Sequence, residues 1–183
     1  MNTTTRRPAI RVVAMAMAAA AAAATTADTA TTTVLVGVDY SEHSYHALEE
    51  AARFVAARLP RGAAELVAVH ARRPLAPAFV PIGAVAPVMS MEEAEQRAME
   101  KLMRDKARGL TAQYGVEVKL EVKDGEARRV LCDAVIEHGA GVLVVGSHGY
   151  GPVRRALLGS VSDHCCRHAS CPVMVVKMPL AKR

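Results

Sequence analysis

The fold is decided by residues 34–59, which read VLVGVDYSEHSYHALEEAARFVAARL. The first five residues form a continuous apolar run that is too short for a helix and ends at Asp39, so the run predicts a buried strand. Ser41 can cap a helix that follows it. Apolar residues then recur at spacings of three and four until Pro60, which gives this helix one apolar face: Ala47, Leu48, Ala51, Ala52, Val55 and Leu59.

Similar strand-like segments recur at 65–70, 116–123, 141–145 and 173–176, with helical segments between them. The segment 116–123 alternates between apolar and charged residues, which is typical of a strand at the edge of a sheet. Five strands separated by four helices predict an α/β fold with a doubly wound parallel sheet in the order 3-2-1-4-5. In this flavodoxin-like (Rossmann-like) arrangement, ligands bind where the strand order reverses, which places a site beside Asp39 and Gly146.

The starts of the second and third expected helices are less obvious from the sequence than the start of the first. The segment after residue 70 contains several prolines up to Pro87, so we interpret it as an irregular loop. Ser90 and Glu93 then predict a capping box at the start of a long helix, and Gly115 predicts its end. A third helix is expected to open at Asp124 or Gly125 and to run to 137.

The composition suits this fold and argues against other classes of protein. Of the 183 residues, 51% are hydrophobic and 3% are aromatic, with no Trp. A core of Val, Leu, Ala and Met suits a parallel sheet between helices, whereas stacking on single-stranded nucleic acid needs aromatic side chains. The formal net charge is +5, and no block of five or more like charges occurs, so no nucleic-acid partner is expected.

The four cysteines lie at positions 132, 165, 166 and 171. They form no C-x-x-C pair, and their spacing to His residues is not that of a zinc site. Such a pattern indicates a reducing compartment. We interpret these cysteines as small residues that pack between helices, and we expect no metal site.

Residues 1–32 are compositionally different from the rest. They are rich in Ala and Thr, carry Arg6, Arg7 and Arg11, and have no acidic residue before Asp28. A disordered tail, an organellar transit peptide and a secretory signal all fit this composition, and the apolar run 12–24 is too short for a membrane span. We therefore expect an extension over 1–32, one domain over 33–178 and a basic tail over 179–183, in the cytoplasm or alternatively in an organelle.

The glycines after the segment 141–145 are the main functional signal. Residues 146–160 read GSHGYGPVRRALLGS, in which Gly146, Gly149 and Gly159 leave the backbone unobstructed. Backbone N–H groups at a turn and at a helix start can cradle an anion, and nearby Ser hydroxyls can add donors. Glycines also occur at such places for geometry alone, so the pattern gains weight from its position at the switch point. It is neither a Walker motif nor a Rossmann glycine turn.

The spacing Gly146-x2-Gly149-x9-Gly159-Ser160 resembles the ATP-binding signature of the universal stress protein family, and the resemblance extends over residues 33–178. It implies a site for ATP, or for AMP or ADP, with Mg2+ as a companion of the triphosphate and with no catalytic residue. The site residues that the resemblance implies are Asp39 at the ribose and adenine, the backbone of Ala71 at the adenine edge, Val145 beside the base or ribose, Gly146, His148 and Gly149 at the ribose and phosphates, and Gly159, Ser160, Val161 and Ser162 at the phosphate tail.

The resemblance also implies a homodimer formed through the last strand, Val173, Met174, Val175 and Val176. The function that we expect is a stress-response switch that binds an adenine nucleotide and hydrolyses it weakly or not at all. Two alternatives stay open. One is a slow ATPase or autophosphorylating protein with Ser160 or Ser162 as acceptor, and the other is an interaction or chaperone-like module that uses no nucleotide.

Overall fold

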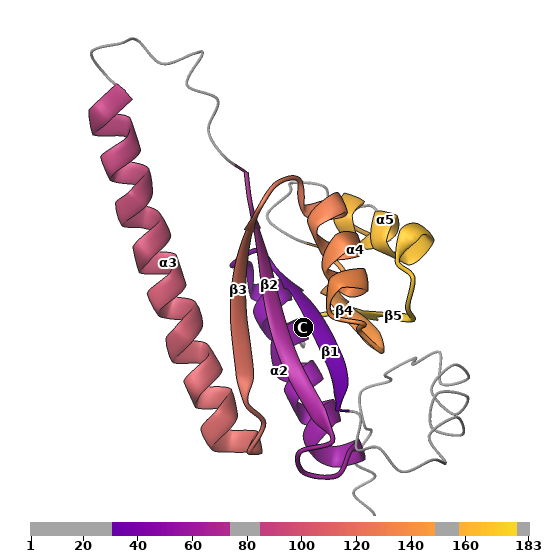
Figure 1. The fold of residues 1–183 in the computed structure, drawn as a ribbon. Coiled ribbons are helices and arrows are strands. Elements are labelled where there is room, and N and C mark those ends of the chain that lie inside the picture. Colours follow the sequence, from indigo (N-terminus) through magenta and orange to yellow (C-terminus); the bar gives the residue numbers. More distant parts are fainter. Residues whose placement is uncertain (1–30, 74–84, 149–157, 179–183) are drawn as a thin grey trace, which may run out of the picture.

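A computed structural model describes residues 31–73, 85–148 and 158–178 of the chain. These ranges hold five strands and four helices: β1 (Thr32–Val38), α2 (Glu42–Arg58), β2 (Ala64–Arg72), α3 (Val85–Tyr114), β3 (Val118–Asp124), α4 (Ala127–Glu137), β4 (Val142–Gly146), α5 (Ser160–His168) and β5 (Val173–Val176). All neighbouring strands are parallel, and their order is β3-β2-β1-β4-β5 (Figure 1). The predicted α/β fold and strand order are confirmed.

β1 lies in the middle of this sheet and has no face toward solvent. It pairs with β2 over its whole length and with β4 over Val34–Val36. Alternate side chains of β1 enter different cores, with Val34 and Val36 on one face and Leu35 on the other. Because both faces are covered by helices, the run has to be apolar at every position.

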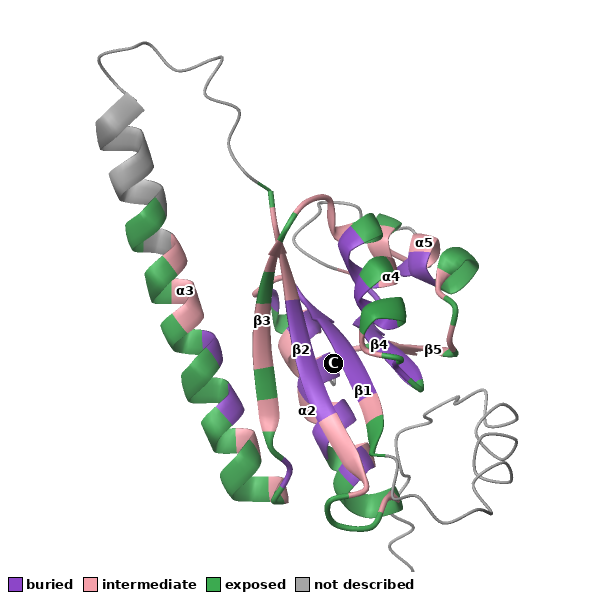
Figure 2. Ribbon diagram, in the orientation of Figure 1, coloured by how far each residue is buried: buried purple, intermediate pink, exposed green. Residues whose placement is uncertain are grey.

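Two apolar cores lie on opposite faces of the sheet (Figure 2). Helices α2 and α3 cover one face, and their buried residues include Ala47, Leu48, Ala51, Ala52, Val55 and Met103. Helices α4 and α5 cover the other face with Val130, Leu131, Ala134, Val135 and Cys165. Burial of these aliphatic side chains, at about 25 cal/mol per Å² of apolar area, is the main favourable contribution to the stability of the fold.

α2 begins and ends close to the predicted residues, but α3 begins earlier than the sequence predicts. Ser41 is the N-cap of α2, and its side chain accepts a hydrogen bond from the Ser44 N–H. α3 begins at Val85, so Ser90 is not its cap, and Pro87 lies inside the helix rather than in a loop. The first turn of a helix tolerates proline because its N–H groups have no intrahelical acceptor. The predicted start of this helix was wrong because Pro87 was taken as part of a loop, although a proline in the first turn is compatible with a helix.

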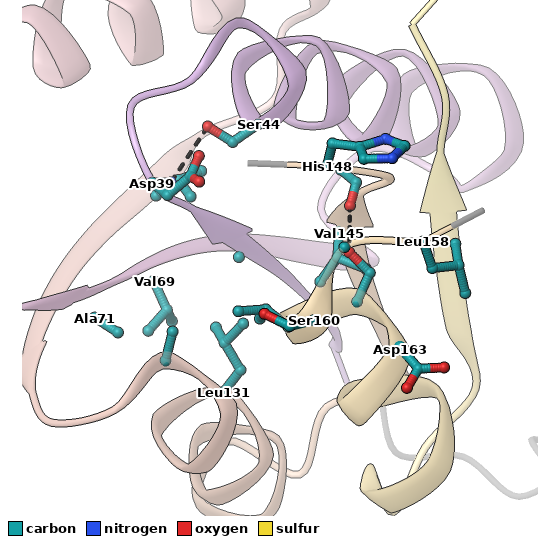
Figure 3. A pocket seen from close by; sticks show the side chains of 17 residues that line it. Asp39, Ser44, Val69, Ala71, Leu131, Val145, His148, Leu158, Ser160 and Asp163 are labelled. Carbon is teal, nitrogen blue, oxygen red and sulfur yellow. Dashed lines mark hydrogen bonds between the residues drawn. The ribbon is translucent and has the colours of Figure 1, made fainter. Parts of the chain in front are cut away.

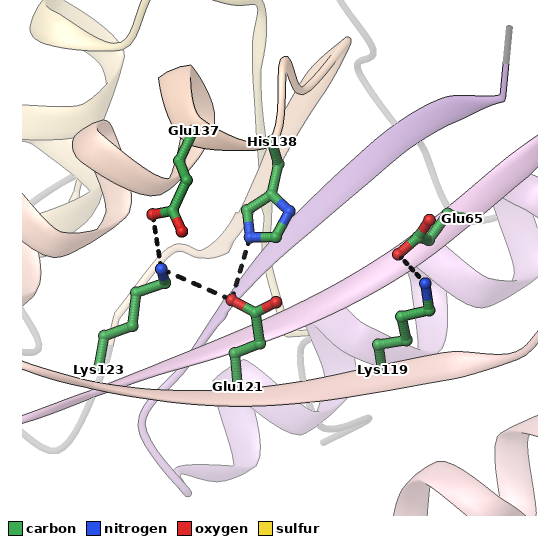
Figure 4. A network of polar contacts seen from close by, with 6 residues as sticks. All are labelled: Glu65, Lys119, Glu121, Lys123, Glu137 and His138. Carbon is green, nitrogen blue, oxygen red and sulfur yellow. Dashed lines mark hydrogen bonds and ion pairs between the residues drawn. The ribbon is translucent and has the colours of Figure 1, made fainter.

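β3 is an edge strand, as predicted, but its side chains do not alternate cleanly between buried and exposed. Val122 is 40% exposed, whereas Glu121 and Lys123 are half-buried. The reason is a polar network with the end of α4: the Lys123 Nζ lies 2.6 Å from a Glu137 oxygen, and the His138 Nε2 lies 3.0 Å from a Glu121 oxygen (Figure 4). These side-chain contacts tie β3 to the end of α4 and draw the charged groups of Glu121 and Lys123 out of full exposure.

Two properties of residues 31–73, 85–148 and 158–178 bear on the class of protein. None of the helices there is both long enough and apolar enough to cross a membrane. All four cysteines fall within these ranges, and each of them is a free thiol.

We expect Leu35→Ala to lower the free energy of unfolding by about 2–5 kcal/mol, because Leu35 is fully buried in the central strand and its truncation leaves a cavity. Chemical denaturation of the full chain measures the change. Leu102→Ala on α3 is the control, since Leu102 is 43% exposed and alanine suits an exposed helical position. Equal losses in the two variants would contradict the central role of β1.

Candidate functional site

Asp39 is held at the end of β1 by the first turn of α2. Its Oδ1 accepts hydrogen bonds from the Ser41 N–H at 3.1 Å and from the Ser41 hydroxyl at 2.5 Å. The Asp39 N–H donates to the Ser44 hydroxyl at 3.2 Å, and that hydroxyl donates to the Ser41 carbonyl at 2.9 Å. These bonds place a carboxylate at the point where β1 turns away from the sheet.

Tyr40 makes this turn possible with a backbone conformation that non-glycine residues rarely adopt. Its φ is 63°, in the left-handed region. The Tyr40 ring lies 4.1 Å from the His70 ring, and the Nδ1 of His70 lies 2.9 Å from the Val38 carbonyl oxygen. Burial, followed by the charge of Glu100, raises the pKa of the Tyr40 hydroxyl to about 12, so it stays protonated at neutral pH. Tyr40 packs against the core under α2 and α3, whereas Asp39 lines the pocket together with residues of the opposite core.

The end of β4 and the start of α5 are joined by two hydrogen bonds. The Ser162 hydroxyl donates to the Gly146 carbonyl at 2.6 Å, and the Gly159 N–H donates to the Ser147 carbonyl at 2.7 Å. A Cβ on Gly146 would come within 3.0 Å of the His43 backbone, and one on Gly159 within 3.3 Å of the Ser147 carbonyl. These two positions are glycine because backbone segments pass each other closely there.

α5 directs its N-terminus toward the same place. Gly159 is its N-cap and offers no side chain to the first N–H groups of the helix. The N–H groups at the start of a helix lack intrahelical acceptors and carry the positive end of the helix dipole. Ser160 is exposed at this end, while Asp163 in the same turn pairs with Arg167 at 2.9 Å. This arrangement suits an anionic group at the start of α5.

These elements enclose a pocket of about 520 Å³, a size typical of small-molecule sites (Figure 3). Nine of the ten predicted site residues line it, and Gly149 lies outside the described residues. The lining residues are Gly37, Val38, Asp39, Ser44, Val69, Ala71, Ala127, Leu131, Val145, Gly146, His148, Leu158, Gly159, Ser160, Val161, Ser162 and Asp163. The structure thus brings together residues from the ends of β1, β2 and β4 and from the start of α5.

Ala71 presents a backbone carbonyl to one end of the pocket. The Arg72 carbonyl accepts from the Gly125 N–H at 2.8 Å and so points toward β3. Successive carbonyls of a strand point to alternate sides, so the Ala71 carbonyl points toward β1. The pairing of β1 ends at Val38↔His70, and the Ala71 carbonyl therefore faces the gap beyond the end of β1. Val69 and Leu131 make the same end apolar (Figure 3).

The side chain of His148 packs beside α2. Its ring centroid lies 5.6 Å from that of His43, and its Nδ1 lies 3.2 Å from the Ser147 hydroxyl. His43 carries no functional signal in the sequence; it lies on α2, and its backbone passes close to Gly146. His148 therefore joins the wall of the pocket to the start of α2.

Several residues that line the pocket were not predicted from the sequence. Gly37 and Val69 could have been found from the alternation of β1 and β2, since they share a face with Asp39 and Ala71. Ala127 and Leu131 had no such signal, because the pattern of an amphipathic helix does not say which of its inward residues lies over the open end of a sheet. Within the described ranges, no group of three or more His, Cys, Asp or Glu side chains could hold a metal ion.

The family model described as the universal stress protein family matches residues 30–177. The chain belongs to the universal stress protein family. Its relatives include a universal stress protein from Mycolicibacterium smegmatis, 32% identical over 78% of this chain and 47% of the relative. Another is a universal stress protein A-like protein from Arabidopsis thaliana, 38% identical over 36% of this chain and 37% of the relative. The chain thus spans less than half the length of these two relatives.

Solved structures of universal stress proteins share the fold. UspA from Lactobacillus plantarum has a TM-score of 0.67 at 23% identity, over 79% of this chain and 97% of that one. A universal stress protein in complex with cAMP has a TM-score of 0.55 at 24% identity, over 82% of this chain and 99% of that one. An Arabidopsis thaliana family member with AMP bound has a TM-score of 0.54 at 21% identity, over 81% of this chain and 93% of that one.

In this universal stress protein, we expect Ser162→Ala to lower the free energy of unfolding by about 1–3 kcal/mol, because the buried Gly146 carbonyl loses its donor. Thermal or chemical unfolding measures the loss. Ser170→Ala, at an exposed position, is the control and should change stability little. An unchanged stability of Ser162→Ala would show that the bond between β4 and α5 does not hold the start of the helix.

Proposed function

We propose that this chain binds ATP or a related adenine nucleotide in the pocket between β1, β2, β4, α4 and the start of α5, and that it acts as a stress-response switch with little or no hydrolysis. The observation that carries the proposal is one cavity that combines an apolar end with a carbonyl, a carboxylate at a strand end, and a helix N-terminus. A base, a ribose and a phosphate chain need these three kinds of group. Fold neighbours solved with cAMP and with AMP support the same ligand class.

The base would lie at the end lined by Val69, Ala71 and Leu131. The Ala71 carbonyl can accept a hydrogen bond from the exocyclic amino group of adenine. Guanine has an oxygen at the corresponding position, which would leave two acceptors facing each other, and an unsatisfied polar group in such a site is costly. The pocket therefore favours adenine over guanine.

The ribose would lie beside Asp39. A carboxylate at the end of a strand near the switch point can accept hydrogen bonds from ribose hydroxyls. Ser41 holds one of the two Asp39 oxygens toward α2, which fixes the orientation of the whole carboxylate. A carboxylate held in this way loses little conformational entropy when a nucleotide binds.

The phosphates would lie at the start of α5, where Ser160, Val161 and Ser162 line the pocket. Their N–H groups and the helix dipole favour a negative charge. Mg2+ that accompanies a triphosphate is usually held by the phosphates and by one or two carboxylates. Asp163 is the carboxylate that α5 contributes to the described lining, so it would hold that ion and exchange its pairing with Arg167 for it.

The polar side chains around the pocket favour binding over hydrolysis. In the described lining, the titratable residues are Asp39, His148 and Asp163. Asp39 belongs to the cap of α2, His148 packs against His43, and Asp163 pairs with Arg167. Efficient phosphoryl transfer needs a group that positions the nucleophile and cations that stabilise the transferred phosphate. The described lining contains no Arg or Lys, so it lacks cations of this kind.

We expect isothermal titration of the full chain to show saturable binding of ATP, ADP or AMP, and no binding of GTP at the same concentrations. Asp39→Asn keeps an acceptor oxygen for Ser41 but loses the charge toward the ribose. It should weaken binding by about tenfold, the value of one charge-assisted hydrogen bond.

Asp133→Asn is the matched control, because Asp133 is exposed on α4 and does not line the pocket. It should bind as the parent chain does. Absence of heat with all three adenine nucleotides, from protein that carries no nucleotide through purification, would instead favour a module that uses no nucleotide.

We also propose that residues 33–178 act as one unit and that two copies pair through β5. β5 is the outer strand of the sheet, and its four residues are half-buried in the single chain. The Leu143 N–H donates to the Pro172 carbonyl at 2.9 Å, and the Ser147 N–H donates to the Val176 carbonyl at 2.7 Å. By alternation, the backbone groups of Val173 and Val175 point outward, where they are available to the edge of a second copy.

Val175→Pro tests this pairing, because it removes an outward N–H and leaves the bonds between β4 and β5 in place. We expect sedimentation equilibrium to show a dimer for the parent chain and a monomer for Val175→Pro, with similar circular dichroism. A variant that still dimerises would place the interface elsewhere.

A further inference from the structure

Two histidines lie next to each other on α5, outside the lining of the pocket. His164 and His168 are four residues apart on this helix, and their ring centroids lie 4.3 Å from each other. Residues at this spacing share one face of a helix and lie one turn apart. His168 is exposed and His164 is half-buried, so solvent reaches the pair. α5 lines the pocket with residues 160–163, so the two histidines form a separate feature of this helix.

The ring nitrogens of the two histidines are not engaged by other side chains. Neither ring makes a hydrogen bond or an ion pair to another residue within 31–73, 85–148 and 158–178. Arg167 lies between the two histidines in sequence, but its guanidinium pairs with Asp163 at 2.9 Å. The positive charge next to the histidines is therefore balanced by a carboxylate. A cation that approaches the two rings meets imidazole nitrogens that no described residue occupies.

Two imidazoles at this spacing suit a divalent transition-metal ion. Histidines at positions i and i+4 of a helix supply two of the ligands in many zinc sites, because one face of the helix presents both rings to one ion. An ion about 2.1 Å from one nitrogen of each ring, at a tetrahedral angle, requires these nitrogens to be about 3.4 Å apart. Rings whose centroids lie 4.3 Å apart can reach this separation by small rotations about their side-chain bonds.

The thiols of α5 do not share this face. Cys165 is fully buried in the core beneath the helix. Cys166 is exposed, but it lies two residues from each histidine, a spacing at which helical side chains do not face each other. Within the described ranges, no further His, Cys, Asp or Glu completes a group of three around the pair, so water supplies the remaining ligands. Imidazole ligands favour Zn2+, Cu2+ or Ni2+ over Mg2+ and Ca2+, which prefer oxygen.

We propose that His164 and His168 form a two-histidine site for a divalent transition-metal ion of the class of Zn2+, and that the bound ion stabilises α5. The site does not depend on the proposed nucleotide binding, since neither histidine lines the pocket. It also differs from a site for the Mg2+ of a triphosphate, because its protein ligands are nitrogens rather than carboxylate oxygens.

The ion would stabilise α5 by linking two successive turns of this short helix. α5 has nine residues, and isolated helices shorter than about 12–15 residues are marginal in water. In the folded chain the two rings are already adjacent, whereas in the unfolded chain nothing holds them together. The ion therefore binds the folded chain more tightly than the unfolded chain, which shifts the equilibrium toward the folded state.

Equilibrium dialysis of the full chain against Zn2+, without nucleotide, tests the site. We expect His164→Ala and His168→Ala each to weaken binding by roughly tenfold or more, because the second imidazole then no longer binds as an intramolecular step. The controls are His46→Ala, at a half-buried histidine of α2, and Cys166→Ser, at the exposed thiol of α5. Both should bind as the parent chain does. Unchanged affinity in the two α5 histidine variants, or a loss in Cys166→Ser, would overturn the proposal.

Thermal unfolding with and without Zn2+ tests the stabilisation of α5. We expect Zn2+ to raise the melting temperature of the parent chain and Mg2+ at the same concentration to leave it unchanged. A double variant with His164→Ala and His168→Ala should melt close to the parent chain in the absence of metal, because alanine suits surface positions of a helix. It should gain nothing from Zn2+. An equal rise in the double variant, or no rise in the parent chain, would overturn the stabilising role.

Discussion

The reversal of strand order at β1 is the constraint on which the rest of this structure depends. β1 pairs with β2 on one side and with β4 on the other, and the connections that leave β1 and β4 go to opposite faces of the sheet. The two chain segments therefore separate at the carboxyl ends of these strands and leave a space between them. The pocket occupies this space, and its lining comes from residues distant in sequence.

Close backbone approach maintains that space. Glycine at 146 lets β4 pass the start of α2, and glycine at 159 lets α5 begin against the residue that follows β4. The Ser162 hydroxyl then joins α5 to the end of β4, and Ser41 joins Asp39 to α2. The polar groups of the candidate site are thus positioned by the same contacts that begin the two helices, so the pocket and the fold depend on the same residues.

Much of this arrangement was predictable from the sequence, and the failures have physical causes. Apolar runs identified β1, β2, β4 and β5, the alternating segment 116–123 identified β3, and the glycine spacing identified residues that line the pocket, because all of these patterns reflect local geometry. Leu131 was not predicted to line the pocket, because an amphipathic pattern shows that a residue points inward but not what lies beneath it. The start of α3 and the half-buried charges of β3 were mispredicted because they depend on a tolerated proline and on contacts with α4.

The separation of the two helical layers by the sheet has a consequence for how such a protein can diversify. α3 packs chiefly on β3, two strands away from β1, whereas the pocket opens on the face covered by α4 and α5. Substitutions on the outer surface of α3 can therefore accumulate without altering the lining of the candidate pocket. One helical layer is free to acquire new surface chemistry while the other keeps the residues of the pocket constant.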